Sequence, residues 1–377
     1  MRRVATLLAL VALASLGSPK SAPAEVSSAT HQPRGDSYHS PLSASTDPSF
    51  PGGGTILFRV QNGPGYAVTG IGMLSTDGSL TEVAGSDESF AYWDPGRGDR
   101  GLLVVQQDRD PEIRAIAIDA GHVTPTGRWT ADDGLFASFS RDGRWIAEVP
   151  FDRRGRLRTG DVVITDRASG RSHILRLGGE LTVSTWSPDG RLLAAPWSGG
   201  GSVFVDPLTG RVEPLLDRTA DLGWGNSVSW SSNGDAFAAT LWGRRSNAIA
   251  IFDREGQLVL NVPIGNRNVS LPTWSPDGTR LAYIVRGPEP RGHLRARLIV
   301  LDVATGRADV VRRDVSDAFW ASWSPDGRWL LVDDWAHHRW LFVSADGRAA
   351  INYPWLGGMP RWCCPSSPGI EVRYPVC

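Results

Sequence analysis

Short stretches in which apolar and polar residues alternate recur along most of the chain, and Gly, Pro, Asn or Asp bound them. A two-residue period is typical of β-strands with one buried face, whereas helices repeat every 3.6 residues. One such strand is expected at 181–186, followed by the turn SPDG at 187–190 and a second strand at 191–195. Pro in the second turn position and Gly in the fourth favour a tight chain reversal. The segment is therefore predicted to form a β-hairpin.

The aromatic residue and the turn after it form an internal repeat. The turn glycines follow one another at intervals of 44 to 49 residues and are Gly143, Gly190, Gly234, Gly278 and Gly327. Third and fourth strands are expected on either side of a second turn, as at 202–216, in IFDREG (251–256) and in LDVATG (301–306). A repeat of this length with four strands indicates a β-propeller.

The number of blades follows from the aromatic residues that end the first strand of each repeat. These are Trp93, Phe139, Trp186, Trp230, Trp274, Trp323 and Trp362. The prediction is an all-β propeller of seven four-stranded blades, with six or eight as alternatives because both ends diverge from the repeat. The N-terminal repeat, from residue 54, lacks a first strand. We expect a strand around Trp362 to complete it, which joins the chain ends and removes open sheet edges.

The W-S-P-D-G turn, followed by a strand and a turn of the type D-x-x-T-G, resembles the WD40-like repeats of TolB-type propellers. The resemblance covers roughly residues 54–377. It implies the propeller fold and says little about activity, because that family includes periplasmic translocation proteins and the propeller domains of peptidases. No α/β-hydrolase domain and no G-x-S-x-G motif accompany the repeats here.

The N-terminus has the pattern of an export signal. Two arginines precede an apolar run and an A-x-A sequence, which predicts a signal peptide at 1–24; an uncleaved anchor is the alternative. Residues 25–50 are predicted to be a flexible Ser/Pro-rich leader, and 51–377 to be the propeller. The three cysteines are Cys363, Cys364 and Cys377. In the oxidising compartment of a secreted or periplasmic protein, Cys364 (or Cys363) is expected to form a structural disulfide with Cys377.

Charge and motif content narrow the range of functions. The formal net charge is −1, which does not favour nucleic acid or an anionic membrane surface. No sequence motif for a cofactor or a metal ion is found, and a monomer is expected. His337 and His338 are expected to be exposed at a loop edge. Asp333 and Asp334 could hold a cation, but a solvated strand end is the preferred interpretation.

Tryptophans outside the repeat motif supply the candidate site. In a four-stranded meander, the connections between strands two and three share one face with the connections between blades. Seven tryptophans are assigned there, Trp197, Trp242 and Trp335 to the former and Trp129, Trp224, Trp320 and Trp355 to the latter. At least four are expected to be exposed, beside the charged residues Arg244, Arg245, Asp221, Asp317 and Asp334. The alternative is that these indoles pack between blades.

These observations predict an exported, non-enzymatic binding or scaffold protein. Its ligand would be a protein, a peptide or a carbohydrate, bound by indole stacking and oriented by the neighbouring charges. The alternative is a propeller-based hydrolase or lyase, directed at carbohydrate or peptide, that uses carboxylates facing the central channel.

Overall fold

The chain divides into two compact units, residues 1–40 and 41–377. A computed structural model describes, within the second unit, residues 50–61, 68–84, 88–94, 100–107, 112–119, 122–130, 136–140, 144–149, 161–176, 181–196, 202–214, 228–241, 246–287, 296–315, 321–334 and 337–363. The predicted signal peptide and nearly all of the leader lie outside these residues. The exception is Phe50, which the sequence analysis placed in the leader. Its ring is buried and stacks on Phe342, with 5.9 Å between the ring centroids. Phe50 therefore belongs to the packed core.

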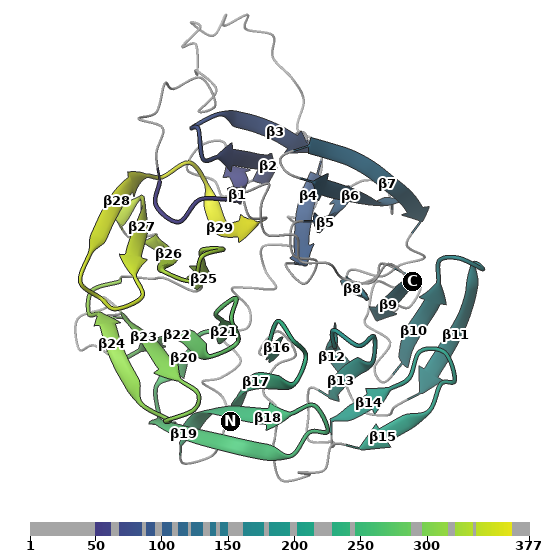
Figure 1. Ribbon diagram of the computed structural model, residues 1–377. Helices are drawn as coiled ribbons and strands as arrows, with labels where there is room; N and C mark the ends of the chain where they lie inside the picture. The colour runs from purple at the N-terminus through teal and green to yellow at the C-terminus, as the bar shows by residue number, and fades with distance from the viewer. Residues whose placement is uncertain are drawn as a thin grey trace, which may run out of the picture. The chain divides into compact units, whose positions relative to one another are not determined.

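The described residues form seven antiparallel sheets of the β-propeller fold, here called blades 1 to 7 (Figure 1). Blade 1 contains β29 (Gly358–Cys363), β1 (Thr55–Gln61), β2 (Val68–Ser75) and β3 (Leu80–Ala84). Blade 2 contains β4 (Glu88–Asp94), β5 (Arg100–Gln107), β6 (Glu112–Asp119) and β7 (His122–Thr130). Blade 3 contains β8 (Phe136–Phe139), β9 (Trp145–Val149), β10 (Asp161–Asp166) and β11 (Arg171–Arg176). Blade 4 contains β12 (Leu181–Trp186), β13 (Leu192–Pro196), β14 (Val203–Val205) and β15 (Val212–Pro214).

The remaining three blades follow in chain order. Blade 5 contains β16 (Val228–Trp230), β17 (Ala236–Leu241), β18 (Asn247–Asp253) and β19 (Leu258–Gly265). Blade 6 contains β20 (Asn268–Val269), β21 (Thr273–Trp274), β22 (Arg280–Arg286), β23 (Ala296–Asp302) and β24 (Ala308–Arg312), and both β20 and β21 pair with β22. Blade 7 contains β25 (Ala321–Trp323), β26 (Trp329–Asp334), β27 (Arg339–Ser344) and β28 (Ala350–Pro354). All seven aromatic residues assigned to first strands lie in the first strand of a blade, which confirms the count of seven.

Blade 1 combines both ends of the described chain. Strand β29 pairs with β1 in antiparallel register, with Ile56 opposite Trp362. In Figure 1 the yellow β29 accordingly lies beside the purple β1. The Trp362 indole is buried and its Nε1 donates a hydrogen bond to the Gly53 carbonyl at 2.9 Å. The predicted completion of the N-terminal blade by a C-terminal strand is therefore confirmed.

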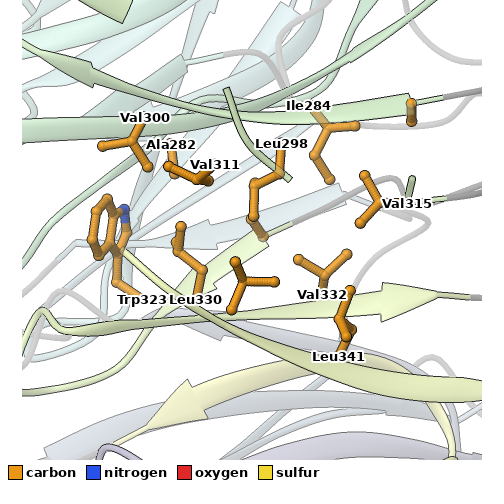
Figure 2. Close-up of a cluster of buried hydrophobic side chains, with 13 residues drawn as sticks. Ala282, Ile284, Leu298, Val300, Val311, Val315, Trp323, Leu330, Val332 and Leu341 are labelled. Atoms are coloured by element: carbon orange, nitrogen blue, oxygen red, sulfur yellow. The ribbon is translucent and has the colours of Figure 1, made fainter. Parts of the chain in front are cut away.

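Neighbouring blades pack face to face through apolar side chains. Figure 2 shows one such cluster, in which Ile284 and Leu298 of blade 6 face Leu330, Val332 and Leu341 of blade 7. Equivalent clusters join blades 3 and 4, 4 and 5, 5 and 6, and 7 and 1. Residues on one strand alternate between two clusters, because successive side chains of a strand point to opposite faces. Each middle strand thus contributes to the core on both sides.

The turn after each repeat aromatic has the predicted chemistry. Gly190 and Gly278 have φ of 87° and 70°, a left-handed conformation that is open to Gly at little cost. Within the turn, Ser275 Oγ accepts a hydrogen bond from the Arg280 amide and donates to Asp277. These contacts explain why Ser and Asp recur in the motif.

The repeat tryptophan connects consecutive blades. Trp323 Nε1 donates to the Thr273 carbonyl of blade 6 at 3.0 Å, and Trp274 Nε1 donates to the Ser229 carbonyl of blade 5 at 2.9 Å. At these two positions the tryptophan therefore packs between blades and also satisfies a backbone carbonyl of the preceding blade, whereas Trp186 and Trp230 have no such acceptor among the described residues. The turns also join repeats, since the Ser232 hydroxyl in the first turn of blade 5 donates to the Pro276 carbonyl in the first turn of blade 6 at 2.8 Å.

Replacing Trp323 by Phe is expected to destabilise the fold by about 1–2 kcal/mol, because the ring burial is largely kept while the partly buried carbonyl of Thr273 loses its donor. Urea denaturation followed by circular dichroism measures the change. The matched control is Trp186→Phe, since the buried Trp186 Nε1 has no hydrogen-bond acceptor among the described residues. The control should therefore cost less. Equal costs for the two variants would show that the hydrogen bond is unimportant.

Candidate functional site

Each blade has two distinct ends. The turns between strands one and two and between strands three and four share one end, here called the turn face. Arg254, in the second turn of blade 5, accordingly contacts Asp189, in the first turn of blade 4, at 2.9 Å. The opposite end, here called the loop face, carries the connections between strands two and three and between blades. There Asn247 Nδ2, which follows the two-to-three connection of blade 5, donates to the carbonyl of Arg267 in the connection to blade 6, at 2.9 Å.

Trp355 is the candidate indole whose side chain the structure describes. It follows the last residue of β28 and is half-buried against the cluster between blades 7 and 1. Its Nε1 donates a hydrogen bond to Asp333 Oδ1, at the end of β26, at 3.1 Å. A blade-to-blade connection and a two-to-three connection thus meet at the loop face, as the strand order requires. Part of the indole remains accessible there.

His338 also contacts the Trp355 indole. Its ring lies edge-on to the Trp355 indole, with 5.9 Å between centroids, and the residue is exposed. It has φ of 49°, and no other non-glycine among the described residues has a positive φ. Backbone conformations of this kind are uncommon for residues with a side chain and often occur at functional sites. The short loop after β26 is therefore held in a specific conformation, with an imidazole beside an indole.

Asp334 lies in a second polar cluster on the opposite face of blade 7. Its carboxylate has 0% exposure and accepts hydrogen bonds from Arg339 Nε at 2.7 Å and from His337 Nδ1 at 2.9 Å. The expectation of a solvated strand end at Asp333 and Asp334 is wrong, because both carboxylates are buried. Alternation along β26 directs them to opposite sides. The expectation that His337 and His338 are exposed is confirmed, with the His337 side chain 46% accessible.

Most of the other predicted site residues lie outside the described part of the chain. These are Trp197, Trp224, Trp242, Trp320, Trp335, Arg244, Arg245, Asp221 and Asp317. Three of the tryptophans directly follow the final residues of β13, β17 and β26, as expected. Whether four indoles are exposed stays a prediction, as does the disulfide between Cys364 and Cys377, which also lie outside.

The structure corrects the placement of Trp129, which was assigned to a connection between blades. It lies within β7, opposite Ile113 of β6, and not in the connection that follows this strand. The fourth strand of blade 2 extends further than the residue pattern indicated. Sequence reasoning also missed Arg339, although Asp-Asp followed closely by His-His-Arg was an available signal for a charged cluster at a strand end.

Carboxylates at the turn face accept hydrogen bonds from residues of the same turn or of a neighbouring turn. A hydrogen bond from the Arg144 guanidinium lowers the pKa of Asp166, and one from the Thr305 hydroxyl lowers the pKa of Asp302. Both oxygens of Asp206 accept hydrogen bonds within its own turn. These groups stabilise the turns in their ionised form. Within the described ranges, no cluster of three or more His, Cys, Asp or Glu could hold a metal ion.

Comparison with known proteins supports the fold. No protein-family model and no curated protein sequence matches the chain. Among solved structures, the periplasmic gluconolactonase PpgL of Pseudomonas aeruginosa is 17% identical, with a TM-score of 0.53, covering 83% of this chain and 99% of its own. An oligogalacturonate lyase in complex with manganese is 15% identical, with a TM-score of 0.53, covering 71% of this chain and 80% of its own. TolB from Acinetobacter baumannii is 20% identical, with a TM-score of 0.45, covering 83% of this chain and 67% of its own.

The similarity to the gluconolactonase and to the oligogalacturonate lyase is consistent with the blades described above, and at such identities it concerns the fold alone. In the part of the chain that the structure describes, no helix is long and apolar enough to cross a membrane. The seven antiparallel sheets make residues 50–363, as far as they are described, a β-propeller, and membership of the TolB-type family stays a prediction.

Proposed function

We propose that this protein is an exported binding protein without enzymatic activity that recognises its ligand at the loop face. The observation that carries the proposal is the contact of Trp355 with Asp333 and His338, where two connections of blade 7 meet. An indole anchored by a buried carboxylate keeps its orientation before the ligand arrives. Less conformational entropy is then lost on binding. The signal-peptide pattern at residues 1–24 supports export.

The enzyme alternative requires a carboxylate that can reach a substrate. Asp334 is fully buried and holds Arg339 and His337, and Asp333 holds the Trp355 indole. Buried carboxylates with such hydrogen bonds are suited to holding neighbouring side chains in place. A general acid or nucleophile must instead approach the reacting atom within hydrogen-bond distance. This difference favours binding over hydrolysis or elimination at the described part of the loop face.

The test is a screen of the purified protein against glycan and peptide libraries, followed by affinity measurements with variants. Replacing Trp355 by Ala is expected to weaken binding of the selected ligand by about 1–3 kcal/mol. The control is Leu208→Ala at the turn face, where the side chain is 70% exposed and no effect is expected. Because Trp355 also contacts the core, Trp355→Phe and an unfolding curve separate loss of binding from loss of fold.

Two outcomes would contradict the proposal. If binding persists in Trp355→Ala but is lost in Leu208→Ala, the ligand binds at the turn face and the proposal is wrong. Turnover of a glycan, peptide or lactone by the wild-type protein would favour the enzyme alternative.

A further inference from the structure

The sequence contains two Asn-Gly pairs, Asn62–Gly63 and Asn233–Gly234, and the second lies in the first turn of blade 5. Asparagine in this pair is prone to deamidation, because glycine has no side chain to hinder the approach of its amide nitrogen to the asparagine side chain. Asn233 is exposed, as are its neighbours Ser232 and Asp235. Water therefore reaches this turn, which lies at the end of the blades opposite to the proposed ligand site.

Asn233 occupies a position that is aspartate in other first turns. The equivalent residues, each of which accepts a hydrogen bond from the serine two positions before it, are Asp189, Asp277 and Asp326. Asn233 Oδ1 accepts the same bond from Ser231 Oγ at 2.8 Å. The residue after the turn glycine is Arg or Thr in those three turns, whereas in blade 5 it is Asp235. Asn233 Nδ2 donates to Asp235 Oδ2 at 2.8 Å, so the amide at position 233 is matched to an acidic neighbour.

The folded turn opposes deamidation. The amide nitrogen of Gly234, which is the nucleophile of the reaction, donates a hydrogen bond to the Ser231 carbonyl at 3.0 Å. Asn233 Oδ1 also accepts a hydrogen bond from the Asp235 amide at 3.2 Å, which fixes the side chain. Both bonds must break before the Gly234 nitrogen can reach Cγ of Asn233. The reaction therefore requires local opening of the turn.

This turn also contacts the blades on both sides. The Ser232 hydroxyl donates to the Pro276 carbonyl of blade 6 at 2.8 Å. On the other side, a Cβ atom placed on Gly234 would lie 3.1 Å from Cβ of Pro188 in blade 4. A change in the backbone of this turn is therefore transmitted to the junctions of blade 5 with its neighbours.

We propose that Asn233 is a site of spontaneous deamidation, that the reaction is limited by opening of this turn, and that its product weakens the attachment of blade 5 to its neighbours. The Gly234 nitrogen forms a bond to Cγ of Asn233, the bond from Cγ to Nδ2 breaks, and ammonia leaves with the amide proton. Water then opens the resulting succinimide ring at one of its two carbonyls, which gives aspartate or isoaspartate.

Both products disfavour the folded turn. Aspartate at position 233 places a second carboxylate beside Asp235, and like charges at hydrogen-bond distance repel each other. Isoaspartate adds a carbon atom to the backbone, which disrupts the hydrogen bond from the Gly234 amide to the Ser231 carbonyl.

The first experiment follows deamidation of the full-length protein by peptide mass spectrometry in mildly alkaline buffer, with and without guanidinium chloride. Asn233 should react about ten to one hundred times more slowly in the folded chain, because only the open turn reacts. Asn62, outside the described residues, gives the reference rate of an Asn-Gly pair in the unfolded chain. Ser232→Ala should raise the folded-state rate at Asn233 at least threefold, since it removes the bond to Pro276. The matched control is Ser169→Ala, an exposed serine in the second turn of blade 3, and it should leave that rate within twofold.

Equal rates at Asn233 in the folded and unfolded chains would overturn the inference. So would the absence of product at Asn233 in the folded chain within the expected range of rates, or equal effects of Ser232→Ala and Ser169→Ala.

The second experiment measures the consequence of the reaction by urea denaturation at low salt, where charge repulsion is least screened. Asn233→Asp reproduces the aspartate product and should lower the denaturation midpoint. Adding Asp235→Ser to it should restore the midpoint to that of Asp235→Ser alone. If Asn233→Asp unfolds at the same urea concentration as the wild type, the aspartate product does not weaken blade 5 and that part of the proposal is wrong.

Discussion

Truncation of the chain after Gly357, which removes β29, is expected to abolish the cooperative unfolding transition of the propeller. Without β29, blade 1 keeps three strands, and β1 loses its ladder with β29 and becomes an open edge, while its ladder with β2 remains. The buried Trp362 indole is lost too, together with its hydrogen bond to Gly53 and the bond from its amide to Ser322 of blade 7. Loss of one buried aromatic side chain alone costs about 3–5 kcal/mol. Such a loss is comparable with the whole stability of many domains.

Thermal denaturation and limited proteolysis of the truncated and full-length proteins measure this effect. The control is a truncation after Cys363, which leaves β29 complete and removes only residues 364–377. It should keep a cooperative transition. A truncated protein without β29 that melts like the full-length chain would mean that the pairing of the chain ends contributes little to stability.

Replacing Asp334 by Ala is expected to be the most destabilising change of a single charged residue in blade 7. Removing one partner of a buried ion pair typically costs about 3–5 kcal/mol, because the remaining charge is left without compensation. Arg339 and His337 retain 26% and 46% side-chain exposure, so water can solvate them in part. We therefore expect the lower end of that range, about 3 kcal/mol, in urea denaturation.

The control for this variant is Asp309→Ala. Asp309 is 57% exposed and its partner Arg307 is 76% exposed, so the loss of this ion pair should change the denaturation midpoint little. A double-mutant cycle with Arg339→Ala isolates the contribution of the pair. If Asp334→Ala unfolds at the same urea concentration as the wild type, the buried carboxylate is not a stabilising centre of the loop face.

The candidate site was only partly predictable. The strand order showed which connections share a face, and Trp355 and Asp333 do meet there. Position in the chain did not show that Asp334 is buried, because its burial accompanies the contacts that His337 and Arg339 make with it once β27 pairs with β26.

The sequence by itself determined the elements, the repeat and the number of blades. Its signals are local: a two-residue period, Gly at turn positions with positive φ, and an aromatic residue before each turn. Even the pairing of β29 with β1 followed, because a repeat without a first strand leaves an open edge to be filled. Tertiary structure alone decided how the repeats hold one another, through indole donors such as Trp323 to the preceding blade. It also decided which charges are paired, since ion pairs and burial depend on residues that are distant in sequence and meet only when neighbouring blades pack.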